Sequence, residues 1–219
     1  MFAKKLQKYK KMRKPITVLI LLIISFNFVS GQERGRIRIS LVLEPVISWM
    51  KSDHRDVGFK GFLPGYNFGM KIDHFIGENY AFATGLTINT VGGKIAYCPP
   101  DYNLPCEIQH YRLKYIEIPL GLRLRSDDFR RINIYGRFGL SPQIKIKSSD
   151  NYDNNIDSEV KLYELGYHLG GGIEYSLGGR SGLILGLIFN NGFTDITKKE
   201  GFPDKTILNR FSVEIGFIF

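Results

Sequence analysis

The chain has 219 residues, 43% of them hydrophobic, and a formal net charge of +9. The length fits one domain, and the positive charge invites a nucleic-acid-binding interpretation. Seven positive charges and no acidic residue lie in residues 1–31, so the rest of the chain carries only 9 − 7 = +2. The positive charge of the whole chain therefore does not indicate a nucleic-acid partner, and we expect none.

The first 31 residues have the organisation of a secretory signal peptide of the Sec type. Seven Lys and Arg side chains precede a short apolar run at residues 16–24, and the small residues Ser30 and Gly31 precede Gln32. A membrane-spanning helix needs about 20 apolar residues, so this run is too short to be one. We predict cleavage after Gly31, with Ser30 as the alternative, which leaves residues 32–219 as one domain.

Eight segments of that domain alternate between apolar and polar residues, which is the pattern of a β-strand with two different faces. In the fourth segment, for example, Ile116 and Ile118 alternate with Glu117 and Pro119. Since Pro cannot donate to a strand ladder, we expect a β-bulge at Pro119, and likewise at Pro45 and Pro142. The predicted strands are residues 36–49, 66–75, 80–91, 115–125, 132–146, 163–175, 183–193 and 209–219.

The connections between these strands alternate in length. The first, third, fifth and seventh are long, at residues 51–64, 94–110, 148–159 and 195–206, whereas the other three are short turns. Long loops at one end and tight turns at the other are typical of an outer-membrane barrel. The sequence therefore predicts an all-β fold, an eight-stranded antiparallel up-and-down transmembrane β-barrel. Both termini would be periplasmic and the long loops extracellular.

The third connection contains both cysteines of the chain, Cys98 and Cys106. Export permits a disulfide, and the Pro- and Asp-rich stretch between them predicts a loop, so we expect the two to be bridged. A zinc site that adds His110 is the alternative, although its spacing matches no standard zinc pattern.

The composition of the two strand faces indicates which face is outside. Small residues crowd the polar face, as expected of the narrow interior of eight strands: Ala81, Ala83, Gly85, Gly121, Gly139, Ser141, Gly170, Gly172 and Gly186. Aromatic residues lie near the strand ends on the apolar face, where a membrane barrel has its girdles. We therefore expect the apolar face to contact lipid. A soluble exported lipocalin-like barrel, apolar inside, is the alternative.

Several pieces of the sequence resemble the PorT-like outer-membrane β-barrel family of the Bacteroidetes group. They are "YIEIPL" at residues 115–120, "YGRFGLSPQIK" from Tyr135, "FNNGFTDI" from Phe189 and the aromatic closing strand. The resemblance implies an eight-stranded outer-membrane barrel; one member type serves a secretion system and most have no assigned activity. Phe217 and Phe219 likewise resemble the C-terminal signal that such barrels present to the barrel-assembly machinery.

Charged residues on the predicted inner face are the candidate site. They are Glu117, Arg123, Arg137, His168, Glu174, Arg210 and Glu214. Because unpaired buried charges are costly, we expect opposite charges to pair and fill the lumen. A narrow pore for small solutes is the alternative.

An outer-membrane enzyme is a further alternative. No Ser or Asp pairs with His54, His74 or His110 in the sequence. His168 and Glu164 are about 13 Å apart along one strand, so we expect no catalytic residue. We expect no cofactor and no metal; the acidic stretch "SSDNYDNNIDSE" matches no EF-hand loop. The expected partners are outer-membrane lipid, the assembly machinery and an envelope or secretion-complex protein that binds the extracellular loops or the rim.

Overall fold

The computed structural model describes residues 37–53, 57–97, 106–127, 129–150, 154, 156, 160–196 and 205–219. These residues form ten strands, and no helix among them is long and apolar enough to cross a membrane. The strands are β1 (Ile37–Ser52), β2 (Val57–Gly61), β3 (Leu63–Phe75), β4 (Tyr80–Tyr97), β5 (Glu107–Glu117), β6 (Leu120–Arg125), β7 (Ile132–Ser149), β8 (Tyr163–Gly178), β9 (Ser181–Gly192) and β10 (Thr206–Ile218).

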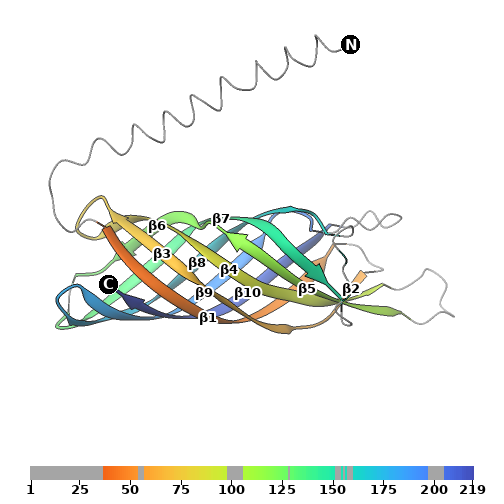
Figure 1. Cartoon of the computed structure of the whole chain (residues 1–219), viewed down its shortest axis with the longest axis horizontal. Helices are drawn as coiled ribbons and strands as arrows, with labels where there is room; N and C mark the ends of the chain where they lie inside the picture. Colours follow the sequence, from red (N-terminus) through yellow and green to blue (C-terminus); the bar gives the residue numbers. More distant parts are fainter. Residues whose placement is uncertain are drawn as a thin grey trace, which may run out of the picture. The chain divides into compact units, whose positions relative to one another are not determined.

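The ten strands make a closed ring of eight positions. β2 and β3 both pair with β4 and occupy one position, and β5 and β6 both lie between β4 and β7. All pairings are antiparallel, and β1 pairs with β10, which closes the ring and leaves no edge. At this seam the N–H of Phe219 donates to the carbonyl of Ile39 at 3.0 Å. The predicted eight-stranded antiparallel barrel is confirmed (Figure 1).

The β-bulges expected at the prolines are wrong. β5 ends and β6 begins around Pro119, yet Glu117 pairs with Gln143 and Leu120 with Leu140, so the register on β7 is unchanged. The missing N–H interrupts the ladder without inserting a residue, and Pro45 and Pro142 also keep their register. The register shifts fall elsewhere, between Phe59 and Gly61, Lys114 and Tyr115, and Ser176 and Gly178.

The outer wall of the ring is apolar and the inside is polar. Side chains on the outer wall are large and exposed, among them Leu41, Leu43, Phe68, Leu86, Leu122, Ile134, Leu169, Leu185 and Ile215. The alternate residues point inward and are buried, including Glu44, Lys71, Asp73, Arg123, Arg137 and Glu214. This is the arrangement of a membrane barrel and the inverse of a lipocalin-like one.

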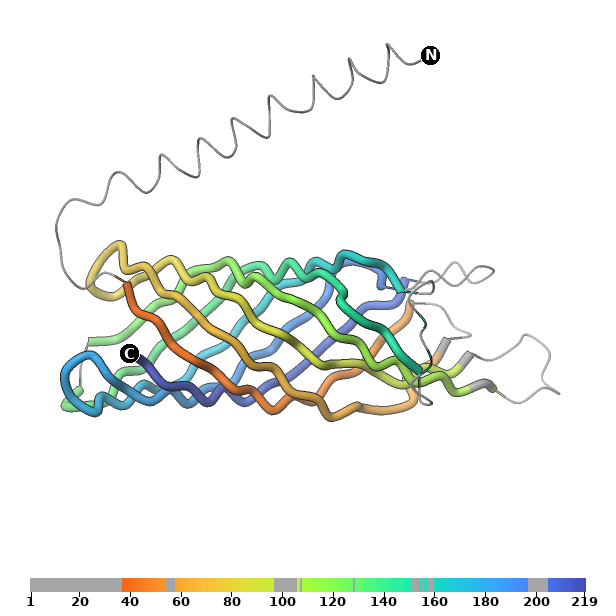
Figure 2. Tube along the Cα trace, viewed as in Figure 1, coloured from red at the N-terminus to blue at the C-terminus, as the bar shows by residue number. Residues whose placement is uncertain are grey.

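The two ends of the barrel differ. At the turn end, short connections join β3 to β4, β6 to β7 and β8 to β9, and β1 begins and β10 ends there (Figures 1 and 2). The opposite end, called the loop end below, carries the longer connections. Strands extend further there than the sequence indicated: β2 lies within the predicted first loop, β4 continues to Tyr97, and β5 begins at Glu107.

The interior of the loop end is apolar. Eleven buried residues form one cluster there, contributed mainly by β1, β4 and β5: Val46, Met50, Val91, Ile95, Tyr111, Leu113, Tyr115, Ile156, Val160, Ile196 and Leu208. We call this the loop-end core. This core was not predicted from the sequence, because the inward face was expected to be polar along the whole strand.

Two predictions concern residues outside the described ranges. The signal peptide at residues 1–31 is one, and Cys98 is the other, so the cleavage and the bridge to Cys106 stay predictions. The domain boundary at residue 32 also stays a prediction.

Candidate functional site

Alternating positions on the barrel strands direct the seven predicted site residues into the lumen, where all are buried. They lie on five strands: Glu117 on β5, Arg123 on β6, Arg137 on β7, His168 and Glu174 on β8, and Arg210 and Glu214 on β10. Together with the polar side chains that contact them, they are called the lumen network below.

Arg123 is the centre of the network near the turn end. Its guanidinium donates to Asp73 Oδ2 at 2.7 Å and to Glu174 Oε1, and it lies 4.0 Å from the centre of the Tyr135 ring. Glu174 also accepts from Arg38 at 2.7 Å. Arg123 is completely buried, and its charge is compensated by carboxylates from β3 and β8.

Glu214 is the centre of the middle of the network. Its carboxylate accepts from Lys71 Nζ at 2.8 Å, from the Tyr135 hydroxyl at 2.6 Å and from Arg137 at 3.4 Å. Lys71 also donates to Glu44. A Cβ on Gly186 would lie 2.2 Å from the Tyr135 hydroxyl, so a residue without a side chain is needed there to admit the tyrosine.

Arg210 and Glu117 form the part of the network nearest the loop-end core. Arg210 donates to Glu117 Oε2 and, at 3.0 Å, to Gln143 Oε1. Asn89 donates to the same Glu117 oxygen. Arg210 therefore pairs with Glu117, whereas Arg137 pairs with Glu214, so each buried arginine has a carboxylate partner.

One contact in the lumen joins a serine to a histidine, and the sequence did not indicate it. Ser141 Oγ lies 2.9 Å from His168 Nδ1, because β7 and β8 pair with Ser141 and His168 two positions apart. Asn190 also donates to Ser141 Oγ at 3.3 Å. The two cavities that adjoin this pair have volumes of about 20 and 10 Å³, room for about one water each. Both side chains of the pair are buried.

Several members of the network were missed as site residues. Glu44, Lys71, Asp73 and Tyr135 occupy the same inward phase, and that alternation was the signal that could have found them. Among the described residues, no group of three or more His, Cys, Asp or Glu is placed to hold a metal ion. Cys98 and most of residues 148–159 lie outside those ranges, so the zinc and calcium alternatives are not tested.

The arrangement can do little chemistry beyond holding itself together. Four cations buried in the lumen, Lys71, Arg123, Arg137 and Arg210, all contact carboxylates. Charges paired in this way offset the cost of burial and occupy the space of the lumen. In the part of the chain that the structure describes, the network therefore fills the lumen with paired charges.

Known proteins share this architecture. The chain resembles Neisserial surface protein A (13% identity, 85% of this chain, 98% of that chain, TM-score 0.57) and the outer membrane protein OprG from Pseudomonas aeruginosa (11% identity, 86% and 98%, TM-score 0.50). At such identities the likeness concerns the fold alone. A comparison with curated protein sequences gives no match. Residues 27–198 match the family described as Outer membrane protein beta-barrel domain, and the chain belongs to this family.

Proposed function

We propose that this protein is a non-catalytic outer-membrane barrel with a closed lumen, which acts through its loop end in binding an envelope or secretion-complex protein. The lumen network carries the proposal: paired buried charges occupy the interior, and the loop-end core occupies its continuation. A filled interior leaves the loops and the rim as the surface on which function can reside.

The orientation and the finer family assignment belong to this proposal. Long loops outside and short turns in the periplasm are the arrangement of bacterial outer-membrane barrels, so the loop end is the extracellular one. The "YIEIPL" piece at residues 115–120 supports a PorT-like relationship. The absence of catalysis is supported by the enclosure of Ser141 and His168.

Conductance in planar bilayers tests the closed lumen. Purified folded protein should give no stable single-channel steps, because the charges would have to separate before ions could pass. As a positive control for detection, Glu214→Ala together with Arg123→Ala removes two network centres and should give measurable leakage. Stable wild-type channels would contradict the proposal and support the narrow pore.

Co-purification tests the binding role. Tagged protein solubilised from outer membranes with mild detergent is compared with a variant in which residues 98–105 and 197–204 are replaced by short Gly-Ser linkers. A heat-dependent shift in gel mobility checks that both barrels are folded. A partner retained by the wild type and lost by the loop variant supports the proposal. Identical sets of co-purified proteins would refute a role for these loops.

A further inference from the structure

The outer wall changes chemistry abruptly on one side of the barrel. On β3, β4, β5 and β7, laterally paired residues form rows across the strands. The last row before the loop end that is apolar on all four strands is Phe68, Ile88, Ile116 and Ile144, although Ile146 is also exposed beyond it on β7. The next row, two residues further along β3, β4 and β5, is Tyr66, Thr90, Lys114 and Lys147. Two residues along a strand correspond to about 7 Å, so cations begin immediately beyond the apolar wall.

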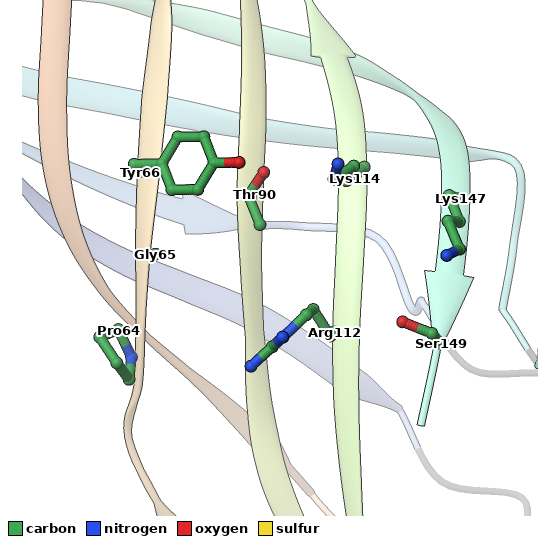
Figure 3. Close-up of a pocket in the computed structure, with 8 residues that line it drawn as sticks. All are labelled: Pro64, Gly65, Tyr66, Thr90, Arg112, Lys114, Lys147 and Ser149. Atoms are coloured by element: carbon green, nitrogen blue, oxygen red, sulfur yellow. The ribbon is translucent and has the colours of Figure 1, made fainter. Parts of the chain in front are cut away.

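This second row surrounds a pocket in the outer wall, with a volume of about 380 Å³. Arg112 lines it together with Tyr66, Thr90, Lys114 and Lys147. Figure 3 shows these side chains on neighbouring strands, with the Tyr66 hydroxyl directed towards Thr90. Three cationic side chains therefore converge on one concave site, and no acidic residue lines it.

Two features of the pocket favour an anionic ligand. Thr90 is 8% exposed, and its buried hydroxyl has no hydrogen-bond partner in the part of the chain that the structure describes. Within the same part, Arg112 and Lys114 form no ion pair. A buried hydroxyl and two cations without a counter-charge would both be satisfied by an anion with several oxygens.

We propose that this pocket binds the phosphate headgroup of a lipid in the leaflet that surrounds the loop end. Lys114, Lys147 and Arg112 would neutralise the phosphate, and Thr90 Oγ1 would donate to one of its oxygens. The neighbouring row towards the turn end is apolar and would contact the acyl chains; it consists of Phe68, Ile88, Ile116 and Ile144. A free phosphate ion would use the pocket but not this wall, so a lipid satisfies more of the site. This inference is independent of the closed lumen and of any protein partner.

The test measures lipid bound to the folded barrel in a neutral detergent by native mass spectrometry. The probes are dioleoyl phosphatidic acid, the phosphate-free dioleoylglycerol with the same chains, and inorganic phosphate as a competitor. The pocket variant is Lys114→Ala with Lys147→Ala. The matched control is Lys51→Ala with Lys60→Ala, which removes the same charge from exposed loop-end positions on β1 and β2 that do not line the pocket.

Wild-type protein should bind phosphatidic acid at least about tenfold more tightly than dioleoylglycerol, and the pocket variant should lose about tenfold, since each basic residue near a membrane surface contributes appreciably to anionic lipid binding. The control should bind as the wild type does. Thr90→Val, which keeps the shape but removes the donor, should weaken binding without altering the heat-dependent gel shift. Equal loss in the control, or no preference for the phosphorylated lipid, would overturn the proposal. Complete displacement by inorganic phosphate at the concentration of the lipid would identify the free ion as the ligand and would overturn it too.

Discussion

β5 and β6 occupy one position in the ring, yet the faces of residues 111–114 of β5 and the faces of β6 have opposite chemistry. On β6, the outward residues Leu120 and Leu122 are apolar, and the inward Arg123 is charged and buried. On β5, the outward Arg112 and Lys114 are charged, and the inward Leu113 is apolar and completely buried. Within about ten residues of one barrel strand, the apolar residues therefore move from the inward face to the outward face, and the charged residues move the opposite way.

From this change of faces we infer where the membrane ends on this side of the barrel. A wall in contact with hydrocarbon must be apolar outside, whereas a wall in contact with water folds like any small β-barrel, with its apolar residues inside. β6 has the faces expected of a wall in hydrocarbon, whereas residues 111–114 of β5 have the faces expected of a wall in water. The loop-end core therefore gives this end of the barrel an apolar interior, whereas the same strands enclose a charged interior further towards the turn end.

The largest expected effect comes from breaking the charged interior. Glu214→Leu leaves Lys71, Arg137 and the Tyr135 hydroxyl without their shared acceptor, and should lower the free energy of unfolding by about 3–5 kcal/mol. Glu214→Gln keeps an acceptor oxygen and should cost less. Urea unfolding in lipid vesicles, followed by gel mobility, measures both. If Glu214→Leu were as stable as the wild type, water rather than Glu214 would be the hydrogen-bond acceptor of these cations.

A smaller effect sharpens the position of the membrane boundary. Leu120→Arg on β6 and Ile108→Arg on β5 introduce the same charge on exposed outward positions of one barrel strand. The first should cost about 2–4 kcal/mol because it faces hydrocarbon. The second should cost under about 0.5 kcal/mol because it faces water. Folded yield in vesicles compares the two, and equal yields would contradict the exchange of faces.

The smallest expected effect compares one methyl group in the two environments. Ile95 is 1% exposed in the loop-end core, and Ile95→Val should cost about 0.5–1.5 kcal/mol, because the neighbouring side chains cannot fill the space completely. Ile134 is 64% exposed on the outer wall, where mobile lipid chains replace the lost contact, so Ile134→Val should be nearly neutral. Unfolding midpoints of the two variants measure this, and a reversed order would assign the wrong solvent to one of the faces.

The sequence alone was sufficient for the eight barrel positions and for the facing of most residues. The alternation of Leu41 and Leu43 with Ser40 and Glu44 indicates which residues share a face, because a strand has two faces and a period of two. The alternation of long and short connections then indicates the barrel. The strand ends at the loop end were predicted less well, since β4 continues to Tyr97 although residues 94–110 were predicted to be a loop.

Which charges pair could not be predicted in this way. Arg210 and Glu117 are 93 residues apart in sequence, and they meet only because of the tilt and stagger of strands on opposite sides of the ring. The change of faces on β5 was not predicted either. Leu113 points inward and Leu120 points outward, yet both belong to segments with the same period of two. Alternation reports that two faces differ, and it does not report which solvent each one meets.

The ion pairs that cross the lumen have a consequence for how the barrel is assembled. Lys71 of β3 reaches Glu214 of β10 across the seam, and Arg123 of β6 reaches Asp73 of β3. A sheet inserted in the bilayer but still open would present these charges to hydrocarbon without their partners, at about 2.5–3.5 kcal/mol or more for each. Partly closed intermediates are therefore disfavoured, and insertion, closure of β1 on β10 and charge pairing become a single all-or-none event. The network thus favours the correct ring, because these charges meet their partners only when the strands are in register.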